Sequence, residues 1–176
     1  MKILKFVLGL ALMILLGFGV LLVVARFSDG PLAIIAGGPL ISGELVSDET
    51  IDWTFVRYVP TVEFQLQEPP RSRTTWILEH AGRIFIPSAY MDTIWGRLWK
   101  QWPVEAERDP RAILRVANRR YPRRLKRIQE GPLVPILVAE LNRKYAAGMS
   151  AEEVELGSLW FFELEPQGSI ESGQDD

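Results

Sequence analysis

The sequence predicts an α+β protein, in which an N-terminal transmembrane helix precedes a small, partly closed antiparallel β-barrel with two or three short helices. Three observations support this fold class. Residues 6–25 form a run without a single charge. From residue 44 onward, segments with apolar side chains at alternate positions are separated by Gly- and Pro-containing turns, which is typical of antiparallel strands. Residues 95–102 and 132–147 instead have apolar side chains at helical spacing.

The charge-free run, FVLGLALMILLGFGVLLVVA, is long enough to cross a bilayer. A helix rises ~1.5 Å per residue, so twenty residues cover ~30 Å, the thickness of the hydrocarbon core. A cleaved signal peptide is the alternative, because Val23-Val24-Ala25 resembles a small-residue cleavage site. The apolar core of a signal peptide is usually only ~7–15 residues long. We therefore expect residues 1–27 to be a retained anchor, with the lipid bilayer as its partner through residues 6–25.

The charges that flank this run predict its orientation. Lys2 and Lys5 precede it, whereas Arg26 and then Asp29 follow it. The positive-inside bias thus favours a single-pass protein with a cytoplasmic N-terminus and a domain on the periplasmic or extracytoplasmic side. The chain has no cysteine, which suits an oxidising compartment and excludes disulfide and zinc–thiolate chemistry.

The remainder of the chain is acidic overall. Lys2, Lys5 and Arg26 account for three of the 20 basic residues, and all 22 acidic residues follow them, which leaves a net charge of −5. The segment from Arg111 to Ile128 is nevertheless strongly basic. Long Arg side chains on a two-stranded ribbon cover apolar surface and pair with Glu, so we expect no nucleic-acid partner.

Composition divides the chain after the anchor into three parts. Residues 28–59 are a Gly/Pro-rich linker with a first strand, residues 60–166 are the barrel domain, and residues 167–176 are a disordered acidic tail. The linker SDGPLAIIAGGPLISG lacks the Lys and the following helix that a phosphate-binding loop needs. We expect it to pack its Leu and Ile side chains on the domain.

The first half of the barrel domain contains the clearest strand pattern. Val62, Phe64 and Leu66 alternate with polar residues, which predicts a half-buried strand. Pro69-Pro70 interrupts the pairing, and residues 71–75 then read as a link to the next strand. Residues 75–78 and 83–86 predict a hairpin around a tight turn at Ala81-Gly82.

The second half predicts another hairpin over residues 111–128, with its turn near Asn118. Pro122 would then lie on an edge strand, because proline cannot donate to a sheet. Three further elements are expected: a helix over residues 132–147, a short helix that begins with a capping box at residues 150–153, and an apolar strand over residues 159–164.

Two segments are candidates for a site. The link Arg71-Ser72-Arg73-Thr74-Thr75 is either a solvated turn or a cradle for an anion, since guanidiniums fork a phosphate and hydroxyls fill its remaining lone pairs. Trp95, Trp99 and Trp102 share one face of a short helix that Pro103 would end. That face is either core or a flat wall for an aromatic ring. The sequence assigns no catalytic side chain and no metal site, because His80 is the only histidine and no nucleophile motif is present.

The order of these elements over about residues 60–165 resembles the split β-barrel proteins that bind flavin or deazaflavin, namely the pyridoxamine-phosphate-oxidase-like and deazaflavin-dependent nitroreductase groups. The resemblance implies FMN or a deazaflavin as cofactor, a redox reaction and a homodimer. It places the cofactor phosphate on Arg71, Ser72, Arg73, Thr74 and Thr75, and the ring beside Tyr90, Trp95 and Trp99. The link lacks both glycines of the Gly-Arg-Lys-Ser-Gly pattern in the deazaflavin group. The alternative is a non-enzymatic, membrane-tethered binding or scaffold domain.

Overall fold

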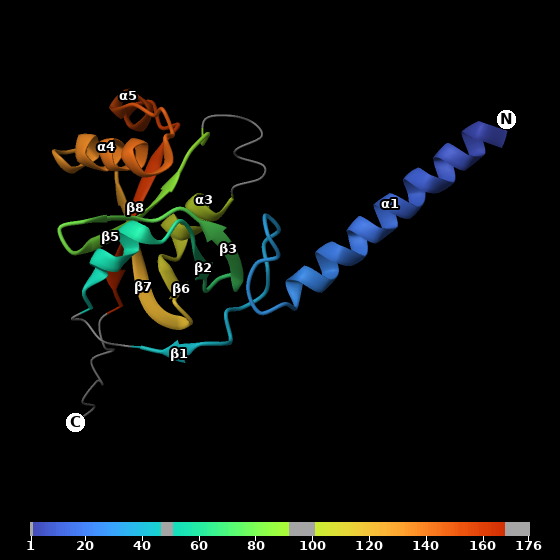
Figure 1. Cartoon of the computed structure of the whole chain (residues 1–176), viewed down its shortest axis with the longest axis horizontal. Coiled ribbons are helices and arrows are strands. Elements are labelled where there is room, and N and C mark those ends of the chain that lie inside the picture. Colours follow the sequence, from blue (N-terminus) through green and yellow to red (C-terminus); the bar gives the residue numbers. More distant parts are fainter. Residues whose placement is uncertain (1, 47–50, 92–100, 168–176) are drawn as a thin grey trace.

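The computed structural model describes residues 2–46, 51–91 and 101–167, in which a long helix leads into a domain built on one curled sheet (Figure 1). The described sheet has eight strands in the order β3-β2-β6-β7-β8-β5-β4, and β1 pairs in parallel with β7. The strands are β1 (Glu44–Leu45), β2 (Val62–Leu66), β3 (Arg71–Thr75), β4 (Leu78–His80), β5 (Arg83–Ser88), β6 (Arg111–Val116), β7 (Arg119–Ile128) and β8 (Trp160–Pro166). The helices are α1 (Lys2–Arg26), the 3-10 helix η1 (Trp53–Tyr58), α3 (Trp102–Arg108), α4 (Leu133–Tyr145) and α5 (Ala151–Glu155).

The sheet curls because its two ends are joined by a very short link. β3 and β4 are the first and last strands in the sheet order, yet only Trp76 and Ile77 separate them in the sequence. Two extended residues reach no more than about 10 Å, so the two edges must approach each other. The result is an antiparallel half-barrel, and the α+β class expected from the sequence is confirmed.

Alternation and turn chemistry place the main strands as expected. Val62, Phe64 and Leu66 are buried in β2. The β6–β7 turn has positive φ at Ala117 and Asn118, and the β4–β5 turn has positive φ at Ala81 and Gly82. Consecutive left-handed residues are what a two-residue hairpin turn requires, so both predicted hairpin turns are confirmed, although the first strand of the first hairpin is Leu78–His80 and not residues 75–78.

Two hydrophobic clusters lie on the two faces of the sheet. The cluster inside the curl contains Phe64 of β2 and Leu114 of β6, and Trp102 of α3 packs edge-on against Phe64 at 4.8 Å. The outer cluster joins α4 and α5 to β4, β5 and β8, with Leu137 and Phe161 at its centre. The capping box predicted at Ser150 opens α5.

Three expectations about local structure are wrong. Residues 71–75 are not a link but a strand, since β3 pairs with β2 from Leu66↔Arg71 to Val62↔Thr75. Pro103 does not end a helix but stands in the first turn of α3, where its missing N–H costs nothing. Pro122 lies in β7, a central strand. It is tolerated there because it falls where β7 changes neighbours, from β1 at Arg119 and Arg120 to β8 from Arg123 onward.

The helix expected around Trp95 and Trp99 falls largely on residues 92–100, which lie outside the described part of the chain, as do residues 168–176 of the expected tail. Among the described helices, α1 is the one long and apolar enough to cross a membrane. It stands apart from the core, and Ala25 is its only buried residue. A membrane span and a signal sequence share these properties.

Candidate functional site

The arginine cleft is a hollow of about 560 Å³ between β3, the start of α3, the end of α1 and residues 34–36. Arg71 and Arg73 point to the same side of β3, because residues two apart in a strand share a face. Trp102 forms part of the opposite wall, so the arginines and one predicted tryptophan do meet in a single hollow. The cleft is lined by Leu22, Arg26, Ile34, Ile35, Ala36, Pro69, Arg71, Arg73, Thr74, Gln101, Trp102 and Glu105.

Arg73 is a largely desolvated cation that has only a distant counter-ion among the described residues. Its side chain is 20% exposed, and its nearest carboxylate, Glu105, lies 3.9 Å away. Its guanidinium sits 5.9 Å from the ring centroid of Phe64. Burial, only partly offset by Glu105, lowers the pKa of Arg73 to about 10. An anion in the cleft would therefore relieve an existing electrostatic cost.

Two guanidinium N–H groups in this cleft are buried without a hydrogen-bond acceptor. These are Nε of Arg71 and Nη1 of Arg73, as judged over the described residues. Arg123 Nε and Arg127 Nε, which lie outside the cleft, are buried without a partner in the same way, so the unpaired atoms alone do not mark a ligand position. Two converging guanidiniums suit a phosphate or carboxylate, which they bind with charge-assisted hydrogen bonds.

Ser72 faces the other way and already has a partner. Its side chain is fully buried, and its Oγ donates to the carbonyl oxygen of Gly38 at 2.6 Å. The backbones of Ser72 and Gly37 also pair, with N···O distances of 2.9 and 3.3 Å. Ser72 thus fastens the segment after α1 to the free edge of β3, and it does not line the cleft.

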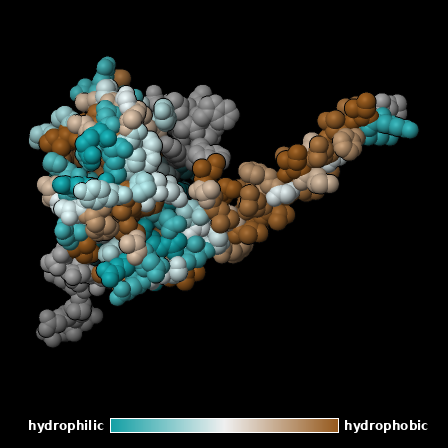
Figure 2. Space-filling view, viewed as in Figure 1, coloured by the Kyte–Doolittle hydropathy of each residue, from teal (hydrophilic) through white to brown (hydrophobic). Residues whose placement is uncertain are grey.

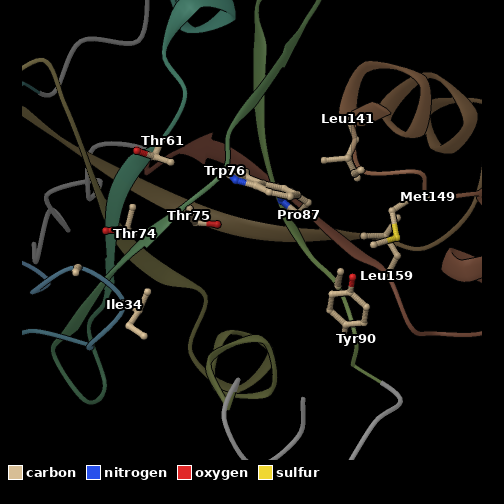
Figure 3. Close-up of a pocket in the computed structure, with 13 residues that line it drawn as sticks. Ile34, Thr61, Thr74, Thr75, Trp76, Pro87, Tyr90, Leu141, Met149 and Leu159 are labelled. Carbon is tan, nitrogen blue, oxygen red and sulfur yellow. The ribbon is translucent and has the colours of Figure 1, made fainter. Parts of the chain in front are cut away.

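A second hollow, the aromatic cleft, has a volume of about 400 Å³ and continues from the first. Both clefts include Ile34 and Thr74 in their walls, so they adjoin along β3, and the two adjoining clefts are together called the groove. Thr75, Trp76, Pro87 and Tyr90 line the aromatic cleft, and Figure 3 shows Trp76 and Pro87 close together with Tyr90 beyond them. The groove therefore has a cationic end and an apolar, aromatic end. Its two volumes fall in the usual range for ligand sites, ~300–1,000 Å³.

Trp76 is the groove residue that the sequence analysis did not single out. Its ring stacks on Tyr145 of α4, with centroids 4.5 Å apart and planes inclined by 8°. The Tyr145 hydroxyl donates to the carbonyl oxygen of Pro60 at 2.7 Å and accepts from the backbone N–H of Ile77 at 3.0 Å. Tyr145 thereby fixes one face of the indole, and 40% of Trp76 stays exposed. The feature of the sequence that could have identified Trp76 is its position directly after the polar stretch 71–75.

The structure thus brings most of the expected site residues to one groove. Arg71 and Arg73 lie at one end, Tyr90 lies at the other, and Thr74 lines both clefts. Trp95 and Trp99 belong to the part of the chain that is not described.

Several basic side chains of the β6–β7 hairpin pair with carboxylates of the same molecule, although Arg123 Nε and Arg127 Nε are buried without a hydrogen-bond partner among the described residues. Arg127 pairs with Glu107 at 2.6 Å, and its guanidinium lies 3.3 Å from the ring centroid of Trp160. Lys126 pairs with Glu165 at 3.0 Å. These arginine and lysine side chains hold neighbouring elements together, as the sequence analysis expected.

Comparisons with known proteins found structural similarity but no match in sequence. No family model and no curated protein matches the chain. Among solved structures, the conserved hypothetical protein Rv2991 from Mycobacterium tuberculosis is similar at a TM-score of 0.48 and 12% identity, with 70% of this chain and 86% of that chain covered. A putative pyridoxamine 5'-phosphate oxidase from Listeria innocua is similar at 0.47 and 9%, with 64% and 88% covered. The curled antiparallel half-barrel agrees with the partly closed antiparallel barrel that the sequence predicts.

Proposed function

We propose that the chain is a membrane-anchored split-barrel domain that binds a flavin- or deazaflavin-type cofactor in the groove along β3 for a redox reaction. The observation that carries this proposal is that Arg71 and Arg73 line one end of a groove whose other end is aromatic. A ligand that carries a phosphate and a flat ring needs cationic side chains for the phosphate and an apolar wall for the ring.

The residues of the groove suit such a cofactor. Arg71 and Arg73 would hold its phosphate, and the Thr74 and Thr75 hydroxyls lie between them and the ring site. Trp76, braced by Tyr145, would exclude water from one side of the ring. The bound cofactor supplies the hydride-transfer chemistry, while the protein binds and orients it, so the lack of an acid–base cluster is compatible with a redox role.

The same proposal makes α1 a retained membrane span with a cytoplasmic N-terminus. Lys2 and Lys5 support this orientation, as does the length of the apolar run. Because the chain has no cysteine, a single Tyr58→Cys variant can report the location of the domain, since Tyr58 is 89% exposed. A membrane-impermeant maleimide should label this variant in intact cells. Labelling only after lysis would refute the orientation.

Cofactor binding is tested on the full-length protein in lipid nanodiscs. The visible spectrum shows any cofactor that co-purifies, and titration with FMN and with a deazaflavin gives dissociation constants. Each charge-assisted hydrogen bond contributes about 2 kcal/mol, so Arg71→Ala and Arg73→Ala should each weaken binding ~30-fold. Arg119→Ala is the matched control, because its side chain is 58% exposed and, within the described part of the chain, its ion pair is with exposed Glu44 at 3.5 Å. Equal binding by all variants, or no binding by the wild type, would overturn the proposal.

Two observations favour a second candidate, a non-enzymatic membrane-tethered binding or scaffold domain. The hydroxyl of Ser72 is already committed to Gly38, and the stretch 71–75 contains no glycine that would let the backbone approach a phosphate. A folded wild-type protein that binds neither FMN nor a deazaflavin would favour this candidate.

A further inference from the structure

The segment between α1 and β1 contains an exposed loop that has no polar side chain. Residues 30–37 read GPLAIIAG. Leu32, Ala33 and Ile34 form its exposed tip, and Ile34 is 85% exposed. The sequence analysis expected the Leu and Ile residues of the linker to pack on the domain. Leu40 does so, but Ile34 does not. An exposed apolar tip of this kind calls for a partner.

The loop is compact and therefore keeps its tip in place. The backbones of Leu32 and Ile35 exchange hydrogen bonds of 3.1 and 2.9 Å across the tip, and Ala33 has a positive φ of 54°. The two limbs touch at their base, where a Cβ on Gly37 would lie 1.8 Å from the carbonyl oxygen of Gly30. Only glycine permits this approach.

Both ends of the loop are fastened. On the helix side, Ser28 Oγ donates to the carbonyl oxygen of Ala25 at 2.7 Å, and the Gly38 N–H donates to the carbonyl oxygen of Ser28 at 3.2 Å. On the sheet side, Gly37 pairs with Ser72 of β3. The loop is thus tied to the last turn of α1 and to the sheet edge at once, which fixes it relative to both.

The tip lies beside the apolar end of α1. Ile34 and Ile35 line the arginine cleft together with Leu22 of the helix. Leu22 stands four residues before Arg26, or ~6 Å along the axis and within the apolar run. Figure 1 shows the loop next to the base of α1, and Figure 2 shows the hydrophobic surface of α1 continuing onto the adjoining domain.

We propose that the loop of residues 30–37 inserts its tip into the bilayer surface beside α1 and gives the domain a second, fixed membrane contact. This inference rests on the proposed anchoring of α1, and its test needs no cofactor, although Ile34 also lines the groove. The lipid surface is the partner because the tip is apolar, lies at the level of the last helical turn and continues the apolar surface of the helix. A short apolar element at this depth gains free energy by burial at the headgroup–acyl boundary.

The absence of cysteine allows a direct test with single-cysteine variants of the full-length protein. Ile34→Cys, Leu15→Cys and Leu156→Cys replace aliphatic side chains that are 85%, 67% and 71% exposed in the protein alone. Each variant is labelled with the environment-sensitive fluorophore nitrobenzoxadiazole. It is then reconstituted into vesicles of phosphatidylcholine and phosphatidylglycerol that contain a doxyl-labelled lipid quencher. Circular dichroism verifies that all three fold alike.

The expected result is strong quenching at positions 15 and 34 and several-fold weaker quenching at position 156. Quenching at position 34 as weak as at position 156, with position 15 strongly quenched, would overturn the second contact and leave the anchor standing. Weak quenching at all three positions would overturn the anchor and the inference together.

Discussion

Replacing Arg115 by methionine should loosen the segment after α1 from the sheet. The Arg115 side chain in β6 is only 11% exposed and reaches across to this segment. Its Nε donates to Glu63 at 2.6 Å, and its Nη1 donates to Asp29 Oδ1 at 2.7 Å and to Ser42 Oγ at 2.9 Å. Methionine keeps most of the apolar stem and removes all of these bonds.

The magnitude follows from what the substitution leaves behind. Removing one partner of a buried ion pair costs ~3–5 kcal/mol, because a charge stays buried without compensation. Asp29 and Glu63 are each 33% exposed, so water can partly replace the lost guanidinium. We therefore expect a loss of about 2–3 kcal/mol. For a domain of this size, that loss corresponds to a fall in Tm of roughly 4–12 °C.

Urea denaturation of the domain, followed by tryptophan fluorescence, measures this loss. Arg119→Met is the matched control, since its exposed pair with Glu44 should contribute less than about 1 kcal/mol. A double-mutant cycle with Asp29→Asn should show a coupling energy of about 1 kcal/mol or more. Equal losses of stability for Arg115→Met and Arg119→Met, with no coupling to Asp29, would refute the proposal that Arg115 holds the segment after α1 on the sheet.

The contact between Arg115 and Asp29 also predicts that the stability of the domain depends on pH. Burial alone would raise the pKa of Asp29, but hydrogen bonds from the Ser42 side chain, from the Ile41 and Ser42 backbone and from Arg115 outweigh it and hold the pKa well below its usual 3.8. A carboxylate whose folded pKa lies below its unfolded value contributes stability above the unfolded pKa and loses it as the pH falls toward the folded pKa. The stability difference between the wild type and Asp29→Asn should therefore shrink on acidification below about pH 4. A difference that stays constant would contradict the assignment.

Two further predictions concern the loop after α1 and Lys144 of α4. Gly37→Ala should destabilise the domain by more than about 2 kcal/mol, because its Cβ would meet the Gly30 backbone at 1.8 Å. Gly157→Ala, which meets no atom within 4 Å but has a φ of 76°, should cost only about 1 kcal/mol in the same urea titration. Lys144, whose Nζ donates to the Val56 and Ile77 carbonyls, should titrate near pH 8 in a ¹³C NMR titration, because burial lowers its pKa to about 8. A midpoint near 10.5 would contradict that burial.

Local pattern was enough to place most elements in the sequence. Alternation identified β2, the Ala81-Gly82 and Asn118 positions identified two hairpin turns, and the capping box identified α5. β3 was missed because its residues, RSRTT, have no apolar alternation. It lies at the edge of the sheet, where polar side chains can face the cleft and where the segment after α1, rather than a strand, covers the outer side.

Contacts between distant segments were beyond local reasoning. Nothing in residues 28–43 indicates that Gly37 lies against Ser72 or that Asp29 meets Arg115. The groove itself arises because only two residues bridge β3 and β4, which brings β3 close to Pro87 and Tyr90. The residue types thus indicated the kind of ligand from the sequence alone, whereas the proximity of these residues depends on the curl of the sheet.

The most direct measurement of the central claim compares FMN with riboflavin, which has the same ring but no phosphate, in binding to the full-length protein and to the Arg71→Ala/Arg73→Ala variant. If the two guanidiniums hold the phosphate, the wild type should bind FMN at least ~100-fold more tightly than riboflavin, and the variant should bind the two ligands about equally. A wild type that does not distinguish FMN from riboflavin, or a variant that keeps the full preference, would contradict the claim.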